Sequence, residues 1–267
     1  MQSEMFGDKL DGLEAESISF LNLHYPSEQG YWEVAFSGGK DSCVLYRVVQ
    51  KWSQQTGQKF HATYVDTTID APEVRHFIRD NYPEVDRIKV YPSFFARTKT
   101  RGIPLRSKRW CCDALKKEPR PQVNTVTGIR ADESYQRRAR GRINDYGKFS
   151  TYHPLFWWTG KDVLDYIKRE NLPKCSLYDE GFERIGCIIC PQLSPRQMAR
   201  NKARWPNYYR AFEKVFKERW ERTYGADADW EKALNNWYMN LPLLPKRADG
   251  NELNFKGGQE DATGIIE

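Results

Sequence analysis

One short segment constrains the fold of this chain more than any other. The segment "VAFSGGKDSCVLYRVV" (residues 34–49) is an apolar run, then a polar stretch with two glycines, then a run with apolar residues at helical spacing. Residues 31–36 are therefore predicted to form a buried strand, and residues 42–53 a helix. A glycine-rich turn between such elements is typical of open α/β sheets, which bind ligands at the carboxyl ends of their strands.

The loop between this strand and helix has the chemistry of an anion site. Its glycines allow backbone angles that expose N–H groups, and the helix N-terminus favours negative charge. Its lysine adds charge and its serines add hydroxyl donors, while the aspartate either orders the loop or helps to hold magnesium beside phosphates. The spacing differs from the Walker A pattern. The loop residues are Ser37, Gly38, Gly39, Lys40, Asp41 and Ser42.

The rest of the chain alternates between strand-like and helix-like segments. Strands are predicted at 59–65, 86–91 and 125–129, and helices at 8–24, 71–82 and 159–170, with Asp70 and Thr159 as the N-caps of the last two. This order predicts an α/β fold, a parallel sheet with helices on both faces. We expect a nucleotide-binding domain over 1–195, a helical appendage over 196–245 and a flexible tail over 246–267.

Charge and hydropathy narrow the class of partner. No apolar run reaches membrane-spanning length and the N-terminus is unlike a signal peptide, so we expect a cytoplasmic protein with no membrane contact. Residues 97–142 contain 14 Lys and Arg against 4 Asp and Glu, and residues 196–222 contain 9 against 3. Such stretches favour a nucleotide or nucleic acid, although a solvated face is the plain alternative. The aromatic residues of 196–222 are predicted to pack on the α/β core rather than to stack on nucleic-acid bases, and Trp157 and Trp158 are likewise predicted to lie in the core.

Four cysteines form two pairs. Cys111 and Cys112 are adjacent, and Cys187 and Cys190 form a C-x-x-C pattern. Four thiolates suit a [4Fe-4S] cluster or a structural zinc. Adjacent cysteines are awkward for a zinc knuckle, whereas a larger cluster accepts both if the pair begins a helix or kink. The two remaining cysteines, predicted to be buried thiols, are Cys43 and Cys175.

Together these motifs resemble the phosphoadenosine phosphosulfate reductase family, a branch of the PP-loop ATP pyrophosphatase superfamily with the adenine nucleotide alpha hydrolase-like fold. The resemblance extends over about residues 10–195 and includes the "SGGKDS" loop typical of that superfamily. In character it is nearest to the DNA phosphorothioation ATP pyrophosphatases. The other matching segments are "VDTTIDAPEVRHFI" (65–78), "RSKRWCCDALKKEP" (106–119), "TGIRADESYQRR" (127–138), "HPLFWWTGKDVLDYI" (153–167) and "LYDEGFERIGCIICP" (177–191).

The resemblance implies ATP with Mg²⁺ as the nucleotide and a [4Fe-4S] cluster held by Cys111, Cys112, Cys187 and Cys190. Besides the loop, it implies nucleotide binding by Asp66, Thr67, Gly128, Arg130 and Arg137. It implies catalytic roles for Lys40, Asp41, Asp66 and Arg130.

Two departures from the family favour one activity within it. Sulfonucleotide reductases carry a modified loop of the Ser-x-Gly-x-Glu-Asp kind and a nucleophilic cysteine near the C-terminus. This sequence keeps "SGGKDS", and no cysteine follows Cys190. We therefore expect an AMP-forming ATP pyrophosphatase that activates a nucleic acid, DNA or tRNA, for sulfur transfer. Two further partners are expected: a cysteine desulfurase that donates the sulfur, and a second copy of the chain in a homodimer. The alternatives are a sulfonucleotide reductase and a non-catalytic nucleotide-binding subunit.

Overall fold

The computed structural model describes the backbone of residues 2–243 and the side chains of residues 9–243, so the predicted tail at 246–267 lies outside the described residues. The chain divides into two compact units. The first contains Met1–Arg97 and Trp110–Ile188, and the second contains Thr98–Arg109 and Ile189–Glu267. The second unit therefore includes a short segment, 98–109, that the sequence placed in the first domain. No helix among the described residues is both long and apolar enough to cross a membrane.

A six-stranded sheet forms the centre of the first unit, with strand order β3-β2-β1-β4-β6-β5. Its neighbours pair in parallel except β5, which runs antiparallel to β6. This confirms the predicted α/β fold and adds an edge hairpin that the sequence did not indicate. The strands are β1 (Trp32–Phe36), β2 (Phe60–Asp66), β3 (Asp86–Lys89), β4 (Thr125–Val126), β5 (Ile143–Asp145) and β6 (Ser150–Tyr152).

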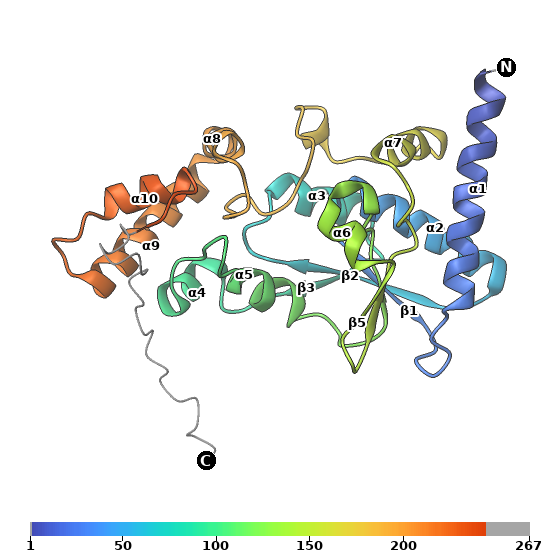
Figure 1. Ribbon diagram of the computed structural model, residues 1–267, viewed down its shortest axis with the longest axis horizontal. Helices are drawn as coiled ribbons and strands as arrows, with labels where there is room; N and C mark the ends of the chain where they lie inside the picture. The colour runs from blue at the N-terminus through green and yellow to red at the C-terminus, as the bar shows by residue number, and fades with distance from the viewer. Residues whose placement is uncertain (1, 244–267) are drawn as a thin grey trace, which may run out of the picture. The chain divides into compact units, whose positions relative to one another are not determined.

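Helices cover this sheet. α2 packs against α1, α7 and β1 (Figure 1), and Trp32, Phe36, Leu45 and Trp52 are fully buried between β1 and α2. The predicted helices at 8–24, 42–53, 71–82 and 159–170 are all present. The helices that begin in this unit are α1 (Gln2–Leu23), α2 (Lys40–Thr56), α3 (Pro72–Asn81), α4 (Phe94–Arg101), α5 (Trp110–Cys112), the π-helical η1 (Asp113–Lys117), η2 (Ala131–Glu133), α6 (Tyr135–Arg140), α7 (Gly160–Arg169) and η3 (Ser176–Tyr178).

Local predictions had mixed outcomes. Thr159 caps α7 as predicted, because its side chain accepts from the Asp162 N–H in a capping box. The prediction for Asp70 was wrong: α3 begins after Ala71 without a side-chain cap, and the Asp70 carboxylate instead accepts from the Tyr64 hydroxyl at 2.9 Å. Trp158 is buried as predicted, whereas Trp157 is 59% exposed, so the core prediction for Trp157 was wrong.

The described part of the second unit contains α8 (Pro195–Arg204), α9 (Pro206–Tyr224) and α10 (Trp230–Tyr238), as the absence of strand patterns predicted. Aromatic residues of α9 and α10 are buried and pack on one another, with ring centroids of Phe212 and Trp237 4.7 Å apart. The predicted burial of these aromatics is confirmed. These ring pairs lie within the second unit.

Candidate nucleotide-binding site

The candidate site lies at the carboxyl edge of the parallel sheet. Because β1, β2 and β4 run in the same direction, the segments that follow them emerge at one edge. These segments are the glycine loop after β1, the turn Thr67–Asp70 after β2 and the stretch Thr127–Arg130 after β4. The fold therefore brings together the three regions that the sequence selected for nucleotide binding.

The glycine loop has a geometry that requires glycine. Gly38 has a φ of 70°, and a Cβ atom there would lie 3.0 Å from the Ile78 side chain. The Ser42 hydroxyl accepts from the Ser37 N–H at 3.3 Å and donates to the Gly39 carbonyl at 2.8 Å. The loop is therefore shaped by its own residues, with the N-terminus of the 17-residue α2 at its end.

Lys40 is held by a segment that the sequence reasoning did not include in the site. Its backbone N–H donates to the Tyr178 hydroxyl at 2.9 Å, and its ammonium donates to the Glu183 carbonyl at 3.2 Å. Burial raises the pKa of Tyr178, so this side chain stays an uncharged phenol. A neutral oxygen thus occupies a position at the helix N-terminus where an anion would be favoured. Tyr178 and Glu183 both belong to the segment "LYDEGFERIGCIICP", which was interpreted from the sequence only through its cysteines.

Asp41 is fixed from the neighbouring strand end. Arg130, only 6% of whose side chain is exposed, donates from Nε to the Asp41 carboxylate at 2.6 Å and from Nη1 to Asp132 at 3.3 Å. Gly128 lies directly against α2, because a Cβ there would meet the Asp41 carbonyl oxygen at 2.9 Å. The carboxylate and the backbone of Asp41 therefore both contact the segment that follows β4.

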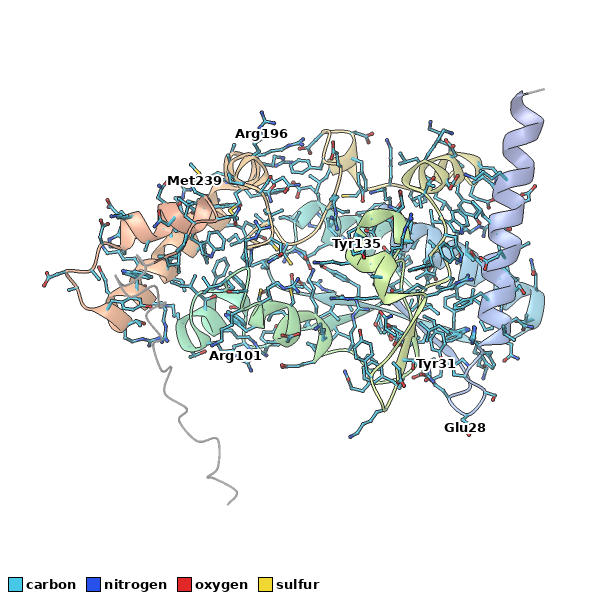
Figure 2. The ribbon with its side chains drawn as sticks, viewed as in Figure 1. Glu28, Tyr31, Arg101, Tyr135, Arg196 and Met239 are labelled. Atoms are coloured by element: carbon cyan, nitrogen blue, oxygen red, sulfur yellow. The ribbon has the colours of Figure 1, made fainter. Side chains whose placement is uncertain are left out.

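The remaining predicted nucleotide contacts are largely engaged with other groups. Asp66 is buried, accepts from the Thr68 N–H at 3.0 Å and pairs with Arg87. Thr67 is also buried, and its hydroxyl lies 3.8 Å from the Cys187 sulfur. Arg137 pairs with Glu133 within the segment that contains the exposed Tyr135 (Figure 2). Thr67 thus links the carboxyl edge of the sheet to the cysteine region.

One cysteine pair lies on the short helix α5, and the other lies in the loop between η3 and α8. Cys111 is buried and Cys112 is partly exposed, and both lie in the first turn of a helix that begins at Trp110 and continues as the π-helical η1. Cys187 pairs with Asp70 in a β-bridge, and it raises the pKa of Lys116. Cys190 belongs to the second unit.

Cysteine sulfurs are donors that suit an iron–sulfur cluster or a zinc ion, and a nearby lysine favours their thiolate form. Within residues 9–243, however, no three His, Cys, Asp or Glu side chains are grouped closely enough to hold a metal ion. The two other cysteines are buried, as predicted. Burial raises the pKa of Cys43 to about 12, so this thiol stays protonated.

Comparisons with known proteins place the chain in a family. Residues 32–193 match the phosphoadenosine phosphosulfate reductase domain, and the chain belongs to that family. An uncharacterized protein of Methanocaldococcus jannaschii is 31% identical over 85% of this chain and 50% of its own length. An adenosine 5'-phosphosulfate reductase of Staphylococcus saprophyticus is 31% identical over 49% of this chain and 63% of its own. The chain thus spans about half the length of the first of these relatives.

The chain is similar in fold to a solved structure. The FMN adenylyltransferase of Candida glabrata, in complex with FMN and an ATP analogue, superposes with a TM-score of 0.50 at 16% identity, over 68% of this chain and 65% of that one. The U34-tRNA thiolase of Methanococcus maripaludis, whose structure contains a [4Fe-4S] cluster, gives a TM-score of 0.49 at 14% identity, over 85% of this chain and 80% of that one. The latter similarity is too low to carry a functional argument.

Proposed function

We propose that this protein is an AMP-forming ATP pyrophosphatase that activates a nucleic acid for sulfur transfer. One observation carries the proposal: the unmodified loop "SGGKDS" lies at the carboxyl end of β1 and leads directly into the N-terminus of α2. Backbone N–H groups and the helix dipole there stabilise a pyrophosphate leaving group, whose negative charge grows as the bond to the α-phosphorus breaks.

The contacts of Lys40 indicate how the loop receives the nucleotide. A phosphate oxygen replaces the Tyr178 hydroxyl as acceptor of the Lys40 N–H, and the Lys40 ammonium leaves the Glu183 carbonyl for the same phosphates. A charged acceptor forms the stronger hydrogen bonds, so the exchange is favourable. Asp41, positioned by Arg130, keeps the first turn of α2 in place.

The proposed reaction has two steps. An oxygen of the acceptor attacks the α-phosphorus of ATP, the bond to the bridging oxygen breaks, and pyrophosphate leaves with Mg²⁺. A sulfur nucleophile, supplied by a donor such as a cysteine desulfurase, then displaces AMP and takes the place of the activated oxygen. DNA phosphorothioation and tRNA thiolation both require chemistry of this class.

We further propose that Cys111, Cys112, Cys187 and Cys190 hold a [4Fe-4S] cluster. The support is the donor type, the place of Cys111 and Cys112 in the first turn of a helix, and the neighbouring Lys116 cation. Four cysteine ligands leave no iron site open, so the cluster would order the acceptor site. Iron and sulfide analysis with a visible absorption spectrum, on protein purified without oxygen, distinguishes this cluster from zinc.

The test of the proposed function is product analysis with ATP and Mg²⁺, with and without duplex DNA or tRNA. We expect pyrophosphate in an amount equal to the AMP that is attached to the acceptor or freed by water, and the loss of both products in Lys40→Ala. The matched control is Lys89→Ala, because Lys89 is exposed on β3. Release of ADP and phosphate would contradict the proposal, and nucleotide binding without turnover under every condition would favour a non-catalytic subunit.

A second candidate activity is supported by the names of several relatives. Adenosine 5'-phosphosulfate reductases are 27 to 31% identical to this chain over about half to three quarters of its length. Incubation with adenylyl sulfate and reduced thioredoxin tests this candidate. Sulfite release together with inactivity toward ATP would replace the proposed function by the reductase.

A further inference from the structure

We propose that residues 98–109, here called the basic segment, bind the phosphate backbone of a nucleic acid. The segment "TKTRGIPLRSKR" contains five lysines and arginines and no acidic residue, and all five side chains are exposed. Arg101 lies at the end of α4 (Figure 2). Within the described residues, Lys99 alone of the five forms an ion pair, with Glu218 at 2.8 Å. Four cationic side chains therefore face solvent without a neutralising partner.

The basic segment is held in one shape by the helices of its own unit. The Trp237 indole N–H donates to the Pro104 carbonyl at 2.8 Å in a buried hydrogen bond. Gln192 donates to the Arg106 carbonyl at 3.1 Å, and the Leu105 N–H closes a turn onto the Lys108 carbonyl at 3.2 Å. Anchored carbonyls fix the backbone under Arg106 and Lys108, so less entropy is lost when their side chains bind.

The surrounding unit reinforces the positive field. Over residues 98–109 and 189–243 the sequence has fifteen Lys and Arg against six Asp and Glu, a balance of +9, although the whole chain carries only +6. A positive field of this kind raises the local concentration of polyanions and speeds their association. The first unit and the residues after 243 together are thus net negative, so the net positive charge of the chain comes from the second unit.

The apolar residues of the unit decide between partners. The aromatics Tyr209, Phe212, Phe216 and Trp220 of α9 are buried, so they offer neither a base-stacking platform nor an apolar face for insertion into lipid. In the described part of this unit, Met239 and Leu241 are the large apolar residues that are exposed. Charge without exposed aromatics favours contact with phosphates, and therefore binding with little sequence preference.

This inference rests on the proposed function for the class of acceptor, but its test needs no ATP. Binding of the full chain to a labelled DNA duplex and to a folded tRNA is measured by anisotropy between 50 and 200 mM salt. Each phosphate contact contributes about 0.9 to the slope of log affinity against log salt on duplex DNA. The double variant Arg106→Gln/Lys108→Gln should lower that slope by about 1.8 and weaken binding at low salt.

The control is Lys89→Gln/Lys148→Gln, which removes two exposed charges from the first unit and should leave the slope unchanged. Equal effects of the two double variants would overturn the inference, as would binding to phosphatidylserine vesicles in place of both nucleic acids. Pyrophosphate release without nucleic acid should be the same in Arg106→Gln/Lys108→Gln and the wild type. A loss of binding with intact pyrophosphate release therefore separates this surface from the nucleotide site.

Discussion

Gly128 lies so close to α2 that adding one methyl group at this position should destabilise the first unit. In Gly128→Ala the new Cβ would lie 2.9 Å from the carbonyl oxygen of Asp41 and 3.0 Å from its carbonyl carbon. Both atoms belong to the backbone of the first turn of α2, so no side chain can rotate away. Either α2 or the segment after β4 must shift by several tenths of an ångström.

The magnitude follows from the cost of overpacking, about 1–3 kcal/mol for an added methylene in a close-packed site. For a unit of this size, each kcal/mol corresponds to a shift in melting temperature of about 2–4 °C. We therefore expect Gly128→Ala to melt about 2–12 °C below the wild type. The displaced atoms adjoin the glycine loop, so the affinity for ATP should also fall. The increase in melting temperature on adding ATP should therefore be smaller than in the wild type, because that increase depends on nucleotide affinity.

The assay is thermal unfolding with and without ATP and Mg²⁺. Gly160→Ala is the control, because a Cβ at this first residue of α7 would have no contact closer than 3.8 Å. It should stay within about 0.5 kcal/mol of the wild type. If Gly128→Ala melted with the wild type and gained the same stabilisation from ATP, the close packing of the β4 segment on α2 would be refuted.

Three further predictions concern other contacts. The Tyr178→Phe variant frees the Lys40 N–H for phosphate, so its affinity for ATP should rise by up to about tenfold in equilibrium binding, the equivalent of one neutral hydrogen bond; a fall in affinity would show that the phenol contacts the nucleotide instead. Thr159→Ala removes the α7 cap and should lower the free energy of unfolding by about 1 kcal/mol in urea denaturation, whereas Thr159→Ser should not. Hydrogen bonding to Asp86, and then to Glu33, raises the pKa of His61 above 6.5, so its contribution to stability is full below pH 6.5 and is lost as pH rises through the folded-state pKa. The stability difference between wild type and His61→Gln should therefore shrink from pH 6 to pH 9, and a difference independent of pH would contradict the ion pairing.

The sequence predicted the parts of the fold that depend on local patterns. Buried parallel strands are near-continuous apolar runs, so β1 and β2 were found within one residue of their bounds. The hairpin of β5 and β6 was missed because its three-residue strands, Ile143–Asp145 and Ser150–Tyr152, are partly exposed and lack a clear alternation. The sequence predicted residues 98–109 to belong to the first domain, whereas they belong to the second compact unit. No local pattern indicates against which unit a short basic segment packs.

In the candidate site, too, the sequence predicted the local motifs but not the contacts between distant residues. The loop residues and Gly128 were selected from their motifs, and the structure brings them together. The contact between Lys40 and Tyr178 spans 138 residues of sequence, and no spacing rule connects them. Arg130 was expected to bind nucleotide, yet its guanidinium is buried against Asp41, a contact that only tertiary packing reveals.

The hydrogen bond from Trp237 to Pro104 joins positions 133 residues apart that belong to the same second unit. A fragment that begins at residue 189 would lack its acceptor and would expose a buried indole N–H. During synthesis, residues 98–109 leave the ribosome well before the helices that hold them. Folding of the second unit must therefore wait until α10 has been made, so a chain that ended after β6 but before α10 would contain the whole sheet while the basic residues 98–109 lacked their Trp237 anchor.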